Sequence, residues 1–193
     1  IASSEHTKLA KEVAEEGIVL LKNKGGLLPL DEGQVKTLAV IGKLAKYPNI
    51  GDRGSSRVNP PYVVTIFEGL KNRLSDKIKL LYSSGSSLEQ AERISKKADA
   101  VIVVAGYTWK DEGEGFDRKI ITLHKEDEEL IKRVAKANSK CIVVLEGGSA
   151  IVIESWKDMV PCILMAWYPG MEGGNAVASI IFGDVNPSGK LPI

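Results

Sequence analysis

The chain has 193 residues, with 26 Lys and Arg against 25 Asp and Glu, and a formal net charge of +1. Its 44% apolar and 26% charged residues are typical of a globular protein that buries one sizeable α/β core, and the length is short for two domains. The charges are mixed along the sequence and no apolar run approaches a bilayer span, so we expect no nucleic acid and no membrane among its partners.

The chain ends and the cysteines add two expectations. No basic segment followed by an apolar stretch opens the sequence, which favours a cytoplasmic protein, although the chain begins at Ile1 and stops at "GKLPI" as if cut from something larger. Cys141 and Cys162 lie in apolar, strand-like segments, which indicates buried free thiols. We expect no metal and no cofactor.

The elements follow in chain order. Apolar residues at helical spacing over 5–22 predict a long amphipathic helix, which "GGLLPL" then ends. Short runs rich in β-branched residues predict buried strands over 35–42, 77–84, 98–106, 139–148 and 160–170. Amphipathic patterns predict helices over 64–74, 87–97, 125–137 and 173–182. This alternation predicts a single α/β domain with an open parallel sheet and helices on both faces.

In such a sheet, ligands are contacted by the loops at the carboxyl ends of the strands. Four such loops are expected here, and two of them are too long to be mere connections. Their sequences are "KLAKYPNIGDRGSSRVNPPY" (43–62), "YTWKDEGEGFDR" (107–118), "EGGSAIVIESW" (146–156) and "YPGMEGGN" (168–175).

The first loop offers glycine amides, Arg53 and hydroxyl groups, which could hold a phosphate. It lacks the glycine–lysine–Ser/Thr ending of a P-loop, and no strand of the chain leads into GxGxxG. The alternatives are a flexible surface loop or a polar rim whose Ser55 and Ser56 donate hydrogen bonds to a hydroxyl-rich ligand.

The second loop, "WKDEGEGFDRK" (109–119), holds four acidic residues and two glycines. Glycoside hydrolysis needs a carboxylic acid that protonates the departing oxygen and a carboxylate across the sugar ring. Aromatic neighbours such as Trp109 and Phe116 can raise the pKa of such an acid by desolvation. Composition alone favours a solvated acidic turn with an Asp117–Arg118 ion contact.

The remaining candidates point to structural roles. His6 and His124 are isolated and we expect His124 on the surface; no GxSxG nucleophile motif is present. Trp156, Trp167 and Tyr168 are expected to pack the sheet edge, and the "EGGSA" turn to allow close helix–strand packing.

Ordered motifs run through almost the whole chain: "EEGIVLLKNKGGLLPL" (15–30), "LAVIG" (38–42), "GDRGSSRV" (51–58), "ADAVIVVAG" (98–106), "EGEGFDR" (112–118), "LHKEDEELIKRV" (123–134), "VVLEGGSA" (143–150) and "AWYPGMEGGNAVASIIFGDVNPSGKLPI" (166–193). Together they resemble the second domain of a family 3 glycoside hydrolase, the β-glucosidase family. The closing stretch is the most specific match. The chain departs from the family pattern at Asp52 and Arg53, where glycine is usual, and at His124 and Asp127, where Pro and Gln are common.

The resemblance implies a six-stranded, mostly parallel α/β sandwich over 35–193, preceded by a helix and linker over 1–34. It implies a retaining β-glucosidase mechanism whose nucleophile, an Asp, belongs to a preceding TIM barrel that this chain lacks. The general acid/base maps onto Glu114, with Glu112 as competitor.

The other site residues follow from the same resemblance. Ser55 maps onto a serine near the bound sugar, with Ser56, Arg53 and Trp109 as further substrate-binding candidates, while Asp117 and Arg118 would hold the loop's shape. The partners implied are a β-glucoside and the barrel, in cis or in trans, and the chain alone should be inactive.

Two other function classes stay open. One is a non-catalytic carbohydrate-binding or scaffolding module that keeps the fold without the reaction. The other is a nucleotide-binding α/β domain.

Overall fold

The computed structural model describes residues 2–51 and 53–192, which form one six-stranded sheet between two layers of helices. The strand order is β1-β6-β5-β4-β2-β3. Neighbouring strands are parallel except at one edge, where β1 runs antiparallel to β6. This confirms the predicted fold class. The strands are β1 (Val19–Asn23), β2 (Thr37–Ile41), β3 (Lys79–Ser83), β4 (Ala100–Gly106), β5 (Cys141–Glu146) and β6 (Cys162–Trp167).

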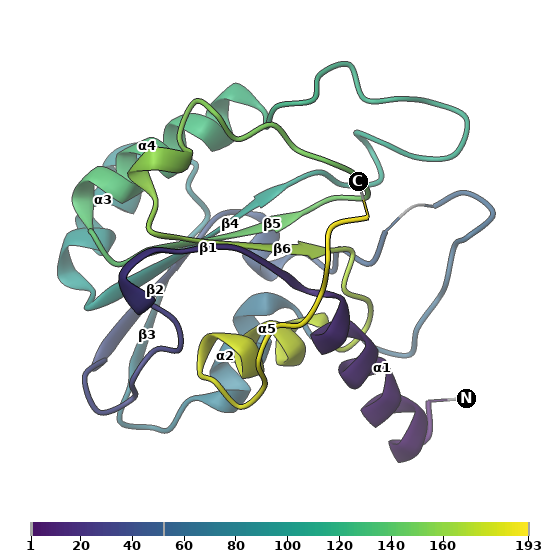
Figure 1. The fold of residues 1–193 in the computed structure, drawn as a ribbon, viewed down its shortest axis with the longest axis horizontal. Helices are drawn as coiled ribbons and strands as arrows, with labels where there is room; N and C mark the ends of the chain where they lie inside the picture. Colours follow the sequence, from purple (N-terminus) through teal and green to yellow (C-terminus); the bar gives the residue numbers. More distant parts are fainter. Residues whose placement is uncertain (1, 52, 193) are drawn as a thin grey trace.

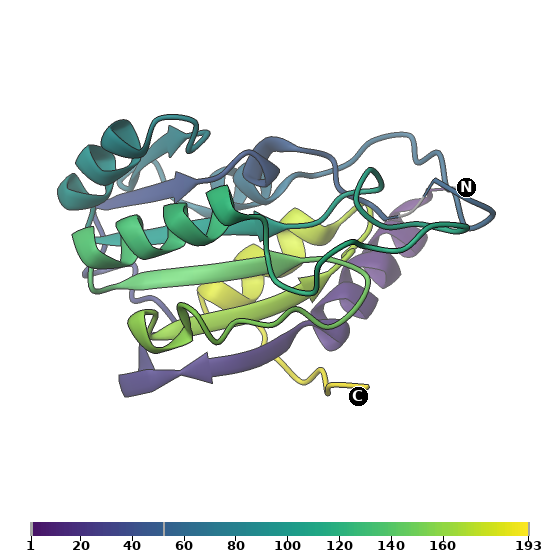
Figure 2. The ribbon, with the colours of Figure 1, turned by 90° about the horizontal axis from the view of Figure 1, so that it is seen from above.

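The helices divide between the two faces of the sheet, as Figures 1 and 2 show. One face carries α1 (Ser4–Gly17), α2 (Ile66–Arg73) and α5 (Gly173–Ile181), and the other carries α3 (Leu88–Lys97) and α4 (Lys125–Ala137). Short 3₁₀ turns cover Lys24–Gly26 (η1), Leu44–Lys46 (η2) and Lys157–Met159 (η3). None of the helices in the described parts of the chain is long and apolar enough to cross a bilayer.

The central strands are buried on both faces, which explains their continuous apolar sequences. Along β4, Ile102 and Val104 pack in the cluster that includes α2 and α5, whereas Val101 and Val103 pack in the cluster that includes α3 and α4. Because successive strand residues point to opposite faces, one apolar strand supplies both cores. Cys141 and Cys162 are buried free thiols, as predicted.

The first predicted helix is wrong beyond Gly17. Residues 5–22 have helical spacing throughout, but α1 ends at Gly17 and β1 follows. Ile18 is fully buried in an extended conformation, and the next residue, Val19, pairs with Met165 of β6. Glycine weakens a helix and β-branched residues favour strands, so edge pairing outweighs the helical period here. The strand β1 therefore belongs to the sheet, although it lies within the segment 1–34 expected to be helix and linker.

The helices α2 and α5 approach each other at two glycines. A Cβ on Gly69 would lie 2.0 Å from the carbonyl oxygen of Gly174, and a Cβ on Gly174 would lie 2.0 Å from that of Thr65. The Gly174 N–H donates to the Val64 carbonyl oxygen at 3.0 Å, and the Val64 N–H donates to the Met171 carbonyl oxygen at 2.8 Å. This contact fixes the end of the long loop after β2 against the loop after β6.

We expect Gly174→Ala to lower the free energy of unfolding by roughly 2–3 kcal/mol, because the added methyl group meets backbone that cannot move aside. Urea unfolding followed by circular dichroism measures the change. Gly17→Ala is the matched control, since a Cβ there meets nothing within 4 Å. Equal stability of the two variants would contradict the close-packing argument.

Candidate functional site

The candidate site lies at the topological switch point of the sheet, where consecutive strands of the sequence pass from one side of β2 to the other. From β2 the chain proceeds to β3 on one side and then crosses to β4 on the other, so the switch point lies between β2 and β4. In open α/β sheets, ligands bind at the carboxyl edge of such a point. The loops that leave β2 and β4 extend beyond the same end of the sheet (Figures 1 and 2).

Glu112 is held by residues of three different loops. Its Oε1 accepts hydrogen bonds from the Tyr168 hydroxyl at 2.6 Å and the Gly148 N–H at 2.5 Å, and its Oε2 lies 3.2 Å from Nε of Arg118. The Glu112 side chain is only 14% exposed. Burial, and next the hydrogen bond to Glu112, hold the pKa of Tyr168 well above its ordinary value, so its hydroxyl remains a donor. The Glu112 carboxylate thus joins the loops that follow β4, β5 and β6.

Arg118 extends this connection. Besides Glu112, its guanidinium donates to the Ala150 carbonyl oxygen at 2.8 Å and to the Ser149 hydroxyl, and it lies 4.6 Å from the centre of the Tyr107 ring. The side chain of Arg118 is 11% exposed. The ion contact expected between Arg118 and Asp117 does not form, because Glu112 takes the guanidinium instead; Asp117 is exposed and has no ion-pair partner among the residues described.

Glu114 lies in an exposed turn of the same loop. Gly113 and Phe116 form an isolated antiparallel bridge around it, and the Ser55 N–H donates to its carboxylate. The contact joins the two long loops across the switch point. The Phe116 side chain, an aromatic neighbour of Glu114 in the sequence, is 49% exposed.

Asp111, near the start of this loop, interacts with His124, which follows the loop in the sequence. Asp111 accepts hydrogen bonds from the Thr108 N–H at 2.9 Å and hydroxyl at 3.0 Å, and its other oxygen lies 2.9 Å from Nε2 of His124. Burial alone would raise the pKa of Asp111, but the hydrogen bonds from Thr108 and His124 outweigh it and lower the pKa. His124, expected on the surface, is partly exposed and also packs edge-on against Tyr107, with ring centres 5.6 Å apart.

Residues of all four loops line an open cleft of about 480 Å³. Ser56 comes from the first loop, Glu112 from the second, Ser149 from the third and Tyr168 from the fourth. A neighbouring pocket of about 390 Å³ shares Ile50 and Gly51 with the cleft. This second pocket contains two further predicted residues, Arg53 and Trp109. Asp52, the other departure from the family pattern in the first loop, lies outside the described residues.

A buried polar pair lies beneath the loops. The Nδ2 of Asn49 donates to the Tyr107 carbonyl oxygen at 2.9 Å and to Oε2 of Glu146 at 3.1 Å. Both side chains are buried, and burial raises the pKa of Glu146 to about 8. At neutral pH Glu146 is therefore mostly protonated, since a buried ionised carboxyl group would lack a countercharge. The pair fixes the first loop to the ends of β4 and β5.

Sequence reasoning missed the part that Tyr168 takes in the cleft. The residue before it, Trp167, has a left-handed φ of +58°, which is rare for a bulky side chain. Its indole N–H donates to the Gly17 carbonyl oxygen at 3.2 Å, and the pairing register between β5 and β6 shifts here. This turn leads directly into Tyr168. The sequence places Tyr168 directly after the last predicted strand, at the sheet edge expected to bind ligand, and this position could have indicated its place in the cleft.

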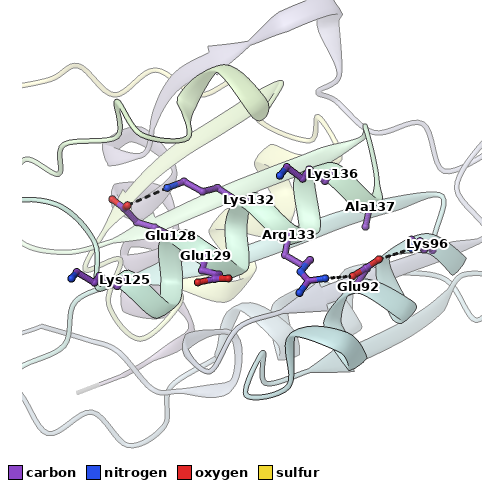
Figure 3. Close-up of a pocket in the computed structure, with 9 residues that line it drawn as sticks. All are labelled: Glu92, Lys96, Lys125, Glu128, Glu129, Lys132, Arg133, Lys136 and Ala137. Carbon is purple, nitrogen blue, oxygen red and sulfur yellow. Dashed lines mark hydrogen bonds and ion pairs between the residues drawn. The ribbon is translucent and has the colours of Figure 1, made fainter.

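A separate hollow of about 640 Å³ lies over α3 and α4, away from these loops (Figure 3). Most of its charged side chains are ion-paired: Arg133 and Lys96 both pair with Glu92, and Lys132 pairs with Glu128. Such exposed pairs are typical of a solvated helix face. Within residues 2–51 and 53–192, no three His, Cys, Asp or Glu side chains are grouped as ligands for a metal ion.

The pH dependence of stability tests the state of Glu146. When the pKa of a carboxyl group is higher in the folded than in the unfolded state, its contribution to stability is fully present at a pH below the unfolded pKa. This contribution is lost as the pH rises through the folded pKa. As the pH rises from the ordinary pKa near 4.5 to beyond the folded pKa of about 8, the loss in unfolding free energy approaches roughly 5 kcal/mol. We expect Glu146→Gln to flatten the decline in unfolding free energy from pH 5 to pH 8, measured by urea unfolding. The control Glu12→Gln, on an exposed face of α1, should keep the parental slope. An unchanged slope for Glu146→Gln would show that another group titrates.

Comparison with known proteins gives the relation of this chain to others. The model of the glycosyl hydrolase family 3 C-terminal domain matches residues 18–193. The chain is 39% identical to a β-xylosidase of Formosa agariphila, with 98% of this chain and 28% of that protein aligned, and 37% identical to thermostable β-glucosidase B of Acetivibrio thermocellus, with 96% and 26% aligned. The crystal structure of a β-glucosidase from Bifidobacterium adolescentis superimposes with a TM-score of 0.88 at 33% identity, over 99% of this chain and 29% of that one. The chain thus spans little more than a quarter of these relatives, and it belongs to the glycoside hydrolase family 3 as its C-terminal domain.

Proposed function

We propose that this chain is the acid/base-bearing domain of a retaining β-glucosidase-type glycoside hydrolase, and that Glu114 is its general acid/base. Support comes from the family to which the chain belongs and from the position of Glu114 on the functional edge of the sheet. The relatives' names refer to β-glucosidases and β-xylosidases, and β-glucosides are the substrate class we propose.

The observation that carries the proposal is the difference between the two glutamates of "EGEG". Glu112 receives a tyrosine hydroxyl, a backbone N–H and an arginine, and is largely buried. A carboxylate held by three donors keeps its position, which suits a structural anchor. Glu114 lies two residues later in an exposed turn between glycines, where a second domain can cover it. Glu114 is therefore the better proton donor to a substrate bound between two domains.

The proposed reaction has two steps. A carboxylate of the barrel domain attacks the anomeric carbon while Glu114 protonates the departing glycosidic oxygen. Glu114, now ionised, removes a proton from water, and the resulting hydroxide equivalent displaces the carboxylate and releases the sugar. No metal or cofactor takes part in this scheme.

The remaining candidates serve the substrate and the loop in this proposal. Ser55 positions Glu114 through its backbone N–H, and Ser56 presents a hydroxyl to the cleft. Trp109 and Arg53 line the adjoining pocket, where they can contact the group beyond the scissile bond. Arg118 keeps the loop in shape through Glu112 and the loop after β5.

Glu114→Ala separates the acid role from the base role. In the complete protein, or with this chain added to a family 3 barrel, we expect turnover of phenyl β-glucoside to fall by a factor of roughly 10² to 10⁴. With 2,4-dinitrophenyl β-glucoside, the rate of the first step should fall less, because that leaving group departs without being protonated. Azide, which attacks without a base, should restore turnover and yield glucosyl azide.

Glu112→Gln is the matched control, because it removes a charge from the same loop. We expect it to lower activity for all leaving groups alike, without azide rescue, since it acts on loop position. Azide rescue confined to Glu112→Gln would reverse the two assignments. Hydrolysis by the chain alone, dependent on Glu114, would show that no barrel carboxylate is needed. A complete protein without any hydrolysis would favour the non-catalytic module.

A further inference from the structure

The pocket beside the cleft has an unusual charge. Two arginines, Arg53 and Arg57, line its 390 Å³, and no Asp or Glu is among the described residues that line it. Neither guanidinium has a carboxylate partner among the described residues, whereas other arginines of the chain, such as Arg73, Arg118 and Arg133, are ion-paired. In a protein of net charge +1, the described residues of this pocket thus concentrate positive charge that they do not pair.

The floor of the pocket is built to hold its shape. The Trp109 indole N–H donates to the Tyr47 hydroxyl at 2.9 Å, and the Arg53 guanidinium lies 4.1 Å from the centre of the Trp109 ring. A guanidinium stacked on an aromatic ring keeps its N–H groups directed outward, where they can bind an anion in bidentate fashion. Tyr62 also lines the pocket, and its hydroxyl donates to the buried Glu172 at 2.7 Å.

The pocket also lies in the right place for a leaving group. It shares Ile50 and Gly51 with the cleft that contains Glu112 and Tyr168. Ser55, between the two arginines in sequence, donates its N–H to Glu114. A substrate whose glycosidic oxygen is protonated by Glu114 can therefore extend its next unit toward Arg53, Arg57 and Trp109.

We infer that this pocket selects substrates whose leaving group carries a carboxylate, such as an acidic saccharide unit or a carboxylated aryl group. The inference rests on the proposed function for the order of units along the substrate. The ring of the leaving group packs on Trp109, and its carboxylate binds between the two guanidinium groups.

The test compares two ligands that differ only in this charge, phenyl β-glucoside and 4-carboxyphenyl β-glucoside. Dissociation constants are measured on the ¹⁵N-labelled chain from shifts of the Trp109 indole N–H, at low salt and in 0.5 M NaCl. We expect the carboxylated ligand to bind about threefold to tenfold more tightly at low salt, as one or two partly exposed ion pairs allow, and salt to reduce that ratio. The paired substitution Arg53→Gln with Arg57→Gln should bring the ratio close to one.

The control is Lys119→Gln, which removes an exposed positive charge from the second loop outside this pocket and should keep the parental ratio. Equal affinity for the two ligands, a preference that survives loss of both arginines, or tighter binding of 4-sulfophenyl β-glucoside than of the carboxylate would each overturn the inference.

Because the test measures binding, it can be repeated in the variant Glu114→Gln. A carboxylate preference without any hydrolysis in the complete protein would keep this inference and reject the proposed reaction.

Discussion

The carboxylate of Glu112 is the interaction on which the arrangement of the cleft depends. Its three donors come from the loops after β4, β5 and β6, so a single charged group connects all three loops, two of which Arg118 also joins through Ser149 and Ala150. Charge-assisted hydrogen bonds of this kind are stronger than neutral ones, and partial burial protects them from competition by water. Glu114 lies two residues further along the same loop, where the Ser55 N–H donates to its carboxylate.

The first loop is connected to this cluster by a different kind of contact. Asn49 reaches the ends of β4 and β5 through neutral hydrogen bonds in a buried site, and the paired glycines of α2 and α5 hold the far end of the same loop. Between these two anchors lie the residues that face the cleft and its neighbouring pocket. A loop fixed at both ends can place a backbone N–H against Glu114 while most of its other side chains stay exposed to solvent.

Much of this arrangement could be predicted from the sequence because it depends on local patterns. Buried β-branched runs alternating with amphipathic ones specify the sheet, its helices and the edge on which the loops gather. The strand β1 was missed because residues 18–22 continue the helical spacing of α1, and only pairing with β6 decides between the two. Tyr168 and Asn49 were missed for a related reason: their partners, Glu112 and Glu146, lie 56 and 97 residues away, and no local pattern reports such a contact. The family resemblance indicated Glu114 and Ser55 as site residues; the contact between them became visible only in three dimensions.

The protonated state of Glu146 has a consequence for the heat of unfolding. Because its pKa is about 8 in the folded chain and ordinary in the unfolded one, unfolding near pH 7 releases close to one proton from this carboxyl group. That proton is taken up by the buffer, so the calorimetric enthalpy contains the buffer's own ionisation heat. Transitions recorded in phosphate and in Tris at the same pH would therefore differ in enthalpy, and the difference would count the protons that the buried carboxyl group binds when the domain folds.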